Sequence, residues 1–126
     1  MNNQLISENI FNTGKTILSK TTIGYDEKRI NQTQPYYNIL AGFIEYFNIS
    51  NVIEIGTHKG GSGLAMMKSN NNLQLVTIDV EEHTMAIERL NKYDTCKRLI
   101  GDSLSTEIQD NVKEYFKNIN GKTLLY

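Results

Sequence analysis

Residues 52–62 constrain the fold of this chain more than any other stretch, and they read Val-Ile-Glu-Ile-Gly-Thr-His-Lys-Gly-Gly-Ser. The first four are mostly apolar and β-branched, and a short apolar run bounded by glycine is typical of a buried parallel strand. Residues 63–68 then have the composition of a helix. A glycine-rich loop between such a strand and a helix brings backbone N–H groups to a ligand at the helix N-terminus. The stretch therefore predicts an α/β fold and a binding site within it.

The loop departs from the motifs that bind nucleotide phosphates. On the G-x-G-x-x-G template of dinucleotide folds it places Gly56, His58 and Gly61, so an imidazole stands where the second glycine should let the pyrophosphate approach. Glu54 at the end of the strand would also repel a pyrophosphate. A P-loop is excluded because Gly61 is followed by Ser62 and not by a Lys-Ser/Thr pair. A carboxylate beside a glycine turn suits a ligand with a positive end and no phosphate.

The pattern Glu54-x-Gly56-x-x-x-Gly60-x-Ser62 resembles motif I of class I S-adenosylmethionine-dependent methyltransferases. The longer string Glu-Ile-Gly-Thr-x-x-Gly-Gly-Ser, which includes Thr57, is similar to the branch with small-molecule O-methyltransferases and cephalosporin-hydroxylase-like proteins. The resemblance implies that the acid addresses the methionyl ammonium of the cofactor and that the glycines let the loop pass under its methionine moiety. It assigns cofactor binding to Glu54, Gly56, Thr57, Gly60 and Ser62.

A second acid follows the next predicted strand, residues 73–79. Asp79 lies 79 − 56 = 23 residues after Gly56, close to the roughly 20 expected before a ribose-binding acid. A carboxylate can accept hydrogen bonds from both ribose hydroxyls. The resemblance implies this role for Asp79 and a weaker contact with the adenine and ribose edge for Val80. The alternative is that Asp79 caps the next helix.

A third acid follows the predicted strand at residues 97–100. Gly101-Asp102-Ser103 resembles the adenine-edge motif of the same family, in which the acid accepts from the adenine amino group and the next backbone N–H serves a ring nitrogen. The resemblance therefore assigns Asp102 and Ser103 to cofactor binding. A turn or a helix cap is the alternative for this short match.

Apolar spacing predicts the remaining elements. Residues 1–33 allow one or two short amphipathic helices interrupted near Gly14, followed by a loop at 21–25. Pro35 suits a first helical turn, and the apolar residues that follow at helical spacing should pack one face on the sheet; they are Tyr36, Ile39, Leu40, Phe43, Ile44 and Phe47. A further helix is expected over 105–118 and a fourth strand over 122–126.

These elements predict an α/β, Rossmann-like fold, and the resemblance implies its methyltransferase form, with three αβα layers and a parallel sheet in the order 3-2-1-4. Residues 1–33 form a preamble, and residues 34–126 form a partial S-adenosylmethionine-binding domain. Because the sequence ends inside an apolar run, we expect only the cofactor-binding half, inactive alone as an enzyme. In the family, acids further along hold a divalent metal, which would come from residues beyond Tyr126. No catalytic base and no metal ligand can be assigned within the sequence.

Composition narrows the partners and the compartment. Lys and Arg number 13 against 14 Asp and Glu, so net charge gives no indication of a nucleic-acid partner. We expect no membrane partner, since no stretch approaches the apolar length of a spanning helix. The single cysteine, Cys96, fits a reducing cytoplasm. A homo-oligomer is left open.

The function that these residues predict is methyl transfer from S-adenosylmethionine to an oxygen of a small molecule. One alternative is a non-catalytic module that binds the cofactor, because the acceptor half of the family's fold has no counterpart here. A less favoured alternative is an NAD-dependent oxidoreductase. It is less favoured because His58 replaces the second glycine of the dinucleotide-binding motif.

Overall fold

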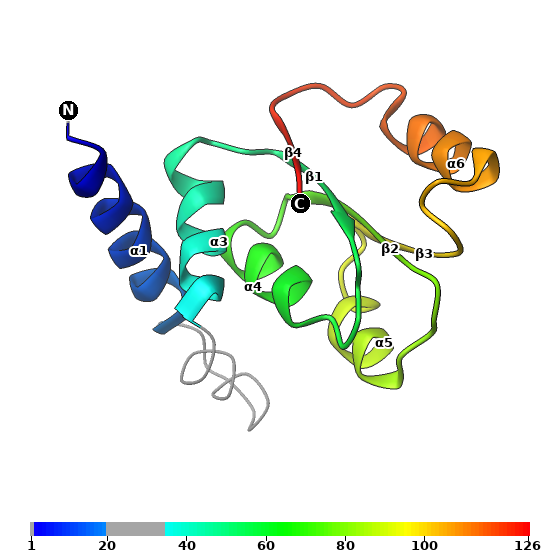
Figure 1. The fold of residues 1–126 in the computed structure, drawn as a ribbon, viewed down its shortest axis with the longest axis horizontal. Helices are drawn as coiled ribbons and strands as arrows, with labels where there is room; N and C mark the ends of the chain where they lie inside the picture. Colours follow the sequence, from blue (N-terminus) through cyan, green and yellow to red (C-terminus); the bar gives the residue numbers. More distant parts are fainter. Residues whose placement is uncertain (1, 20–34) are drawn as a thin grey trace.

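A four-stranded parallel sheet forms the centre of the computed structural model, which describes residues 2–19 and 35–126 (Figure 1). The strands are β1 (Asn51–Ile55), β2 (Gln74–Asp79), β3 (Cys96–Ile100) and β4 (Thr123–Leu125). They lie in the order β3-β2-β1-β4 and all pair in parallel. The predicted strand order is therefore confirmed, and the arrangement is consistent with a Rossmann-like fold. The loop expected at residues 21–25 lies outside the described residues.

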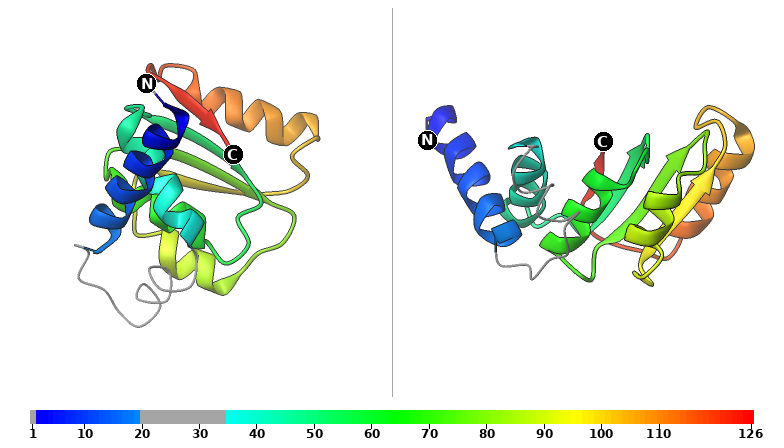
Figure 2. Two further views of the ribbon diagram at one scale, coloured as in Figure 1. Left: turned by 60° about the vertical axis from the view of Figure 1, so that its left-hand side comes forward. Right: turned by 90° about the horizontal axis from the view of Figure 1, so that it is seen from below.

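Helices cover both faces of this sheet (Figure 2). They are α1 (Asn3–Ser19), α3 (Pro35–Tyr46), α4 (Gly61–Ser69), α5 (Thr84–Leu90) and α6 (Thr106–Phe116). Among the described residues, no helix is both long enough and apolar enough to cross a membrane. Helix α4, which connects β1 to β2, packs on one face of the sheet, and α6, which connects β3 to β4, packs on the other.

The alternation of side chains along each strand builds two cores. One core, between the sheet and helices α3 and α4, contains Leu40, Ile44, Ile49, Val52, Met66, Met67, Leu73 and Leu75. The other core, under α6, contains Val76, Ile78 and Ile108 with Ile53 and Leu99 packed against them. Glu54 follows Val52 on the α4 face and is fully buried there. The sheet pattern thus places a carboxylate inside the first core.

Helix α1 is continuous through Gly14, so the predicted interruption near this residue is wrong. Gly14 is buried, and a Cβ added there would collide with the carbonyl oxygen of Asn38 in α3. A Cβ on Gly42 would likewise collide with the carbonyl oxygen of Ile10. The two glycines let the backbones of α1 and α3 approach closely, which is the reason the helix tolerates Gly14 despite its low helix propensity.

Helix α3 packs chiefly between α1 and α4, and this changes the face that it buries. Leu40, Ala41 and Ile44 are buried, whereas Ile39 is 48% exposed and Phe47 is 36% exposed. The predicted apolar face is therefore only partly confirmed. Because α3 contacts both α1 and α4, its buried face is centred on Ala41, which the apolar spacing did not predict.

We expect Gly14→Ala to destabilise the protein by about 1–3 kcal/mol, because the added methyl must push α1 and α3 apart. Urea unfolding of the variant measures this change. Asn12→Ala, on the exposed side of the same helix, is the matched control and should cost little. An increase in stability for Gly14→Ala, as helix propensity alone would give, would contradict the close approach of the two helices.

Candidate functional site

The loop between β1 and α4 turns on two glycines with left-handed backbone. Gly56 has a φ of 97° and Gly60 a φ of 77°, which are conformations that side chains rarely adopt. A Cβ on Gly60 would lie 3.1 Å from the Cα atom of Ala86, so α5 packs closely under this end of the loop. A Cβ on Gly56 would meet nothing within 4 Å. The loop is thus packed at its second glycine and open at its first.

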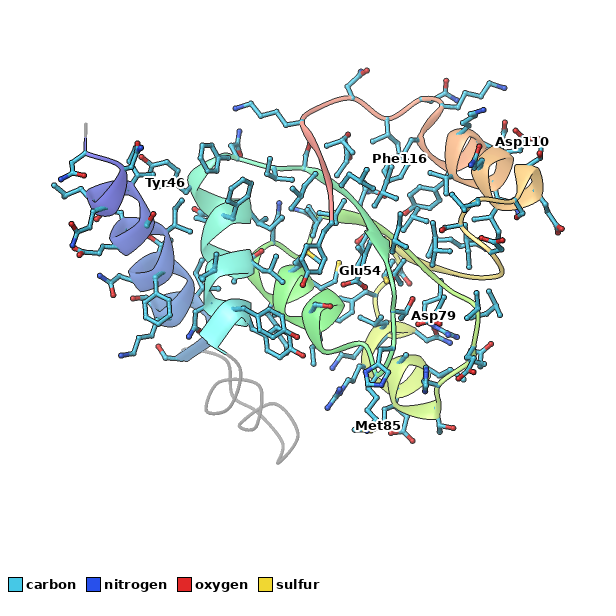
Figure 3. The ribbon with its side chains drawn as sticks, viewed as in Figure 1. Tyr46, Glu54, Asp79, Met85, Asp110 and Phe116 are labelled. Atoms are coloured by element: carbon cyan, nitrogen blue, oxygen red, sulfur yellow. The ribbon has the colours of Figure 1, made fainter. Side chains whose placement is uncertain are left out.

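Glu54, which is labelled in Figure 3, lies next to this loop, and both of its carboxylate oxygens accept hydrogen bonds from hydroxyl groups. The Thr77 hydroxyl donates to Oε1 at 2.6 Å, and the Ser62 hydroxyl donates to Oε2 at 2.5 Å. Ser62 lies in the first turn of α4, where the helix dipole favours a negative charge. The structure thus brings together Glu54 and Ser62, which the resemblance assigns to cofactor binding, and that role remains a prediction.

The burial of Glu54 affects its predicted role as a partner of an ammonium group. Desolvation by burial raises the pKa of Glu54 above its ordinary value of 4.5, and the hydrogen bonds from Ser62 and Thr77 oppose that rise. Because the side chain is fully buried, a ligand ammonium could touch it only if the surrounding groups moved. Direct contact with a ligand remains a prediction.

Thr77 and Thr57 extend the network from Glu54 into the loop. Their hydroxyls are 2.6 Å apart, and both residues are buried. The motifs in the sequence do not include Thr77. A signal for it exists in the sequence, because Thr77 is a polar residue inside the apolar run 75–78, and in the structure it pairs with Glu54 in the parallel register. The predicted cofactor residue Thr57 has its hydroxyl turned inward toward Thr77.

Asp79 ends β2 directly beside the loop. Its Oδ2 accepts the backbone N–H of His58 at 2.7 Å, and its Oδ1 accepts the N–H of Glu81 at 3.1 Å. These hydrogen bonds, that from His58 foremost, hold the pKa of Asp79 below its ordinary value of 3.8. The alternative in which Asp79 caps the next helix is wrong, because α5 has His83 at its N-cap. The acid is an ionised group at the rim of the loop.

The Asp79 carboxylate keeps acceptor capacity for a ligand. An ionised carboxylate offers about four acceptor positions, of which two are taken by backbone N–H groups. The side chain is partly exposed, and the neighbouring Val80 is 69% exposed. Asp79 and Val80 therefore present an acidic and an apolar surface next to each other at the carboxyl end of β2.

Asp102 and Ser103 follow β3, which β2 separates from β1. The Oδ1 atom of Asp102 accepts the N–H of Leu104 at 2.8 Å, and its carbonyl oxygen accepts from the N–H of Ser105. Ser105 in turn caps α6 through the N–H of Ile108. Asp102 is thus used in a turn that starts α6, as the structural alternative proposed, and a cofactor role for Asp102 and Ser103 remains a prediction.

His58 of the loop contacts His83, whereas the cysteine, Cys96, begins β3 at the opposite edge of the sheet. The rings of His58 and His83 meet edge to face with centroids 5.1 Å apart. Burial raises the pKa of Cys96 to about 12, so this thiol is protonated at neutral pH and is a poor nucleophile. Within residues 2–19 and 35–126, no three His, Cys, Asp or Glu side chains gather in a way that could hold a metal ion.

No protein-family model matches this sequence, and no curated protein matches it significantly.

The raised pKa of Glu54 predicts a pH-dependent loss of stability. The folded protein retains the Glu54 proton to higher pH than the unfolded chain does, so the free energy of unfolding falls as the pH rises above about 4.5. Glu54→Gln removes this titration. We measure the free energy of unfolding of both proteins in urea at several pH values. The free energy of unfolding of the variant should increase relative to that of the native protein as the pH rises. A stability difference that does not change with pH would contradict the burial of an ionisable group there.

The lowered pKa of Asp79 predicts a pH dependence of stability opposite to that of Glu54. Its lowered pKa stabilises the folded protein above about pH 3.8, and this stabilisation is lost as the pH falls through the folded value. The stability advantage of the native protein over Asp79→Asn should shrink on acidification, as measured by the same unfolding series. An advantage that grows on acidification would rule out the hydrogen bonds described for Asp79.

Proposed function

We propose that the carboxyl ends of β1 and β2 bind S-adenosylmethionine and that this chain supplies the cofactor-binding half of a methyltransferase. The observation that carries the proposal is the hydrogen bond between the His58 N–H and Asp79, because it joins a glycine-rich loop to an acid on the adjacent strand. In open parallel sheets, ligands bind outside the carboxyl ends of strands where the order reverses. The connections of this sheet change direction at β1.

Asp79 suits the ribose of the cofactor. Its two oxygens each retain an acceptor position beside the N–H groups they already bind, which matches a pair of neighbouring hydroxyls. Val80 offers an exposed apolar side chain next to it for the flat face of a base. These two residues supply polar and apolar contacts for a nucleoside.

The loop and the start of α4 suit the amino-acid end of the cofactor. The open side of Gly56 leaves room for a ligand close to the backbone, and the first N–H groups of α4 lack intrahelical acceptors and favour a carboxylate. The buried Glu54 lies under the same loop and, when ionised, favours a nearby positive charge. A ligand that carries both an ammonium and a carboxylate matches this pairing.

A dinucleotide suits the loop less well. His58 stands at the position of the second glycine of the dinucleotide template, where that template has no side chain, and its ring lies against the ring of His83. Glu54 beneath the turn, when ionised, would also disfavour a doubly charged pyrophosphate. These two residues favour S-adenosylmethionine over NAD.

S-adenosylmethionine supplies an activated methyl group, and the acceptor that we propose is an oxygen of a small molecule. The residues of this chain would bind and orient the cofactor, which lowers the entropic part of the barrier. Glu54, Gly56, Gly60, Ser62 and Asp79 are the residues on which this binding depends. The catalytic base is left unassigned.

The proposal is tested by isothermal titration of the 126-residue chain with S-adenosylhomocysteine, the product form of the cofactor, and separately with NAD. We expect saturable binding of S-adenosylhomocysteine. Asp79→Asn should weaken it by roughly tenfold, about 1.4 kcal/mol, because an amide cannot accept two ribose hydroxyls as a carboxylate does.

Asp110→Asn is the matched control, because Asp110 is an exposed acid on α6, away from the loop (Figure 3). Its affinity for S-adenosylhomocysteine should equal that of the native protein. Tight binding of NAD without S-adenosylhomocysteine would replace the proposal with an oxidoreductase. Cofactor binding without methylation of any acceptor would favour a binding module.

A further inference from the structure

Four buried or half-buried side chains, from β1, β2, α4 and the loop between β1 and α4, form one continuous chain of hydrogen bonds. The chain runs from Ser62 to Glu54, from Glu54 to Thr77, and from Thr77 to Thr57, with donor–acceptor distances of 2.5, 2.6 and 2.6 Å. Glu54, Thr77 and Thr57 have at most 4% of their surface exposed. Hydrogen bonds of this length between buried groups fix the side chains that form them.

The chemistry of the groups determines the direction of this chain. A hydroxyl has one proton, and Thr77 gives its proton to Glu54 Oε1. The Thr57 hydroxyl must therefore donate to Thr77 across their 2.6 Å contact. Thr77 thus acts as an acceptor for the loop and as a donor to the buried carboxylate at the same time.

Thr57 transmits this constraint to the loop backbone. Its N–H donates to the carbonyl oxygen of Ile78 at 3.2 Å, and its own carbonyl oxygen accepts the N–H of Gly60 at 2.8 Å. With its side chain also tied to Thr77, Thr57 is held at three points. The next residue along the chain is His58, whose N–H reaches Asp79.

We propose that Thr77 is a positioning residue of the ligand site: its hydroxyl ties Thr57 to Glu54 and so holds the loop in the conformation in which the His58 N–H reaches Asp79. Thr77 contacts no ligand itself. It lies two residues before Asp79 on β2, so one strand supplies both the acid at the surface and the internal support of the loop. The effect of Thr77 on ligand affinity rests on the proposed function, whereas its effect on the loop does not.

The test compares Thr77→Val, which keeps the shape but loses the hydroxyl, with Thr77→Ser, which keeps the hydroxyl. The first readout needs no ligand: the ¹⁵N–¹H resonance of His58 and the hydrogen-exchange rate of its amide. In Thr77→Val we expect the His58 amide to shift and to exchange roughly tenfold faster, while Thr77→Ser stays close to the native protein. Val52→Ala, which removes methyl groups from the same core, controls for general destabilisation and should leave the His58 resonance in place.

The second readout is the affinity for S-adenosylhomocysteine. Thr77→Val should lose about tenfold and Thr77→Ser should restore it to within about threefold. If the native protein binds no S-adenosylhomocysteine, the proposed function fails, and the His58 readout alone still decides the role of Thr77.

If Thr77→Val does not fold, Thr57→Val and Thr57→Ser provide the same comparison, because Thr57 is the other partner of the hydrogen bond with Thr77. A valine variant whose His58 amide behaves as in the native protein would overturn the proposal, because the hydroxyl would then be dispensable. A serine variant as perturbed as the valine variant would also overturn it, since packing and not the hydroxyl would then hold the loop.

Discussion

The buried carboxyl group of Glu54 is the constraint on which the site depends. A carboxyl group taken out of water is costly unless hydrogen bonds replace those of the solvent, and here hydroxyls of a neighbouring strand and of the following helix provide them. This requirement is met by a threonine that lies between apolar residues of β2 and by a serine in the first turn of α4. It also links β1, β2 and α4 at the point where the sheet meets the loop.

The two acids at this edge of the sheet have opposite environments. Burial raises the pKa of Glu54, whereas backbone N–H groups lower that of Asp79. The buried Glu54 is connected to the loop through the hydroxyls of Thr77 and Thr57. The partly exposed Asp79 remains ionised at the edge of the loop, where it can accept hydrogen bonds. The loop lies between them and is connected to both, through Thr57 on one side and His58 on the other.

The helical layer also bears on the site. The Tyr37 hydroxyl occupies the space that a side chain at Gly61 would need, so α3 packs directly against the first residue of α4. Burial raises the pKa of this phenol, which keeps it neutral. Helix α3 is in turn held by α1 through the close approach at Gly14 and Gly42. The N-terminal helices thus stabilise the start of the helix on which the glycine loop ends.

The sequence by itself determined the glycine loop and the acids at the ends of β1 and β2, because apolar periodicity, glycine and spacing are local signals. The strand order was implied by the family resemblance, and the structure confirms it. The sequence did not determine the role of Gly14, which looked like a break in a helix and is a contact between two helices. It also did not single out Thr77 or the inward orientation of Glu54 and Thr57. Only the tertiary structure decided these, because a hydrogen bond across parallel strands depends on register and burial, which arise when distant segments pack together.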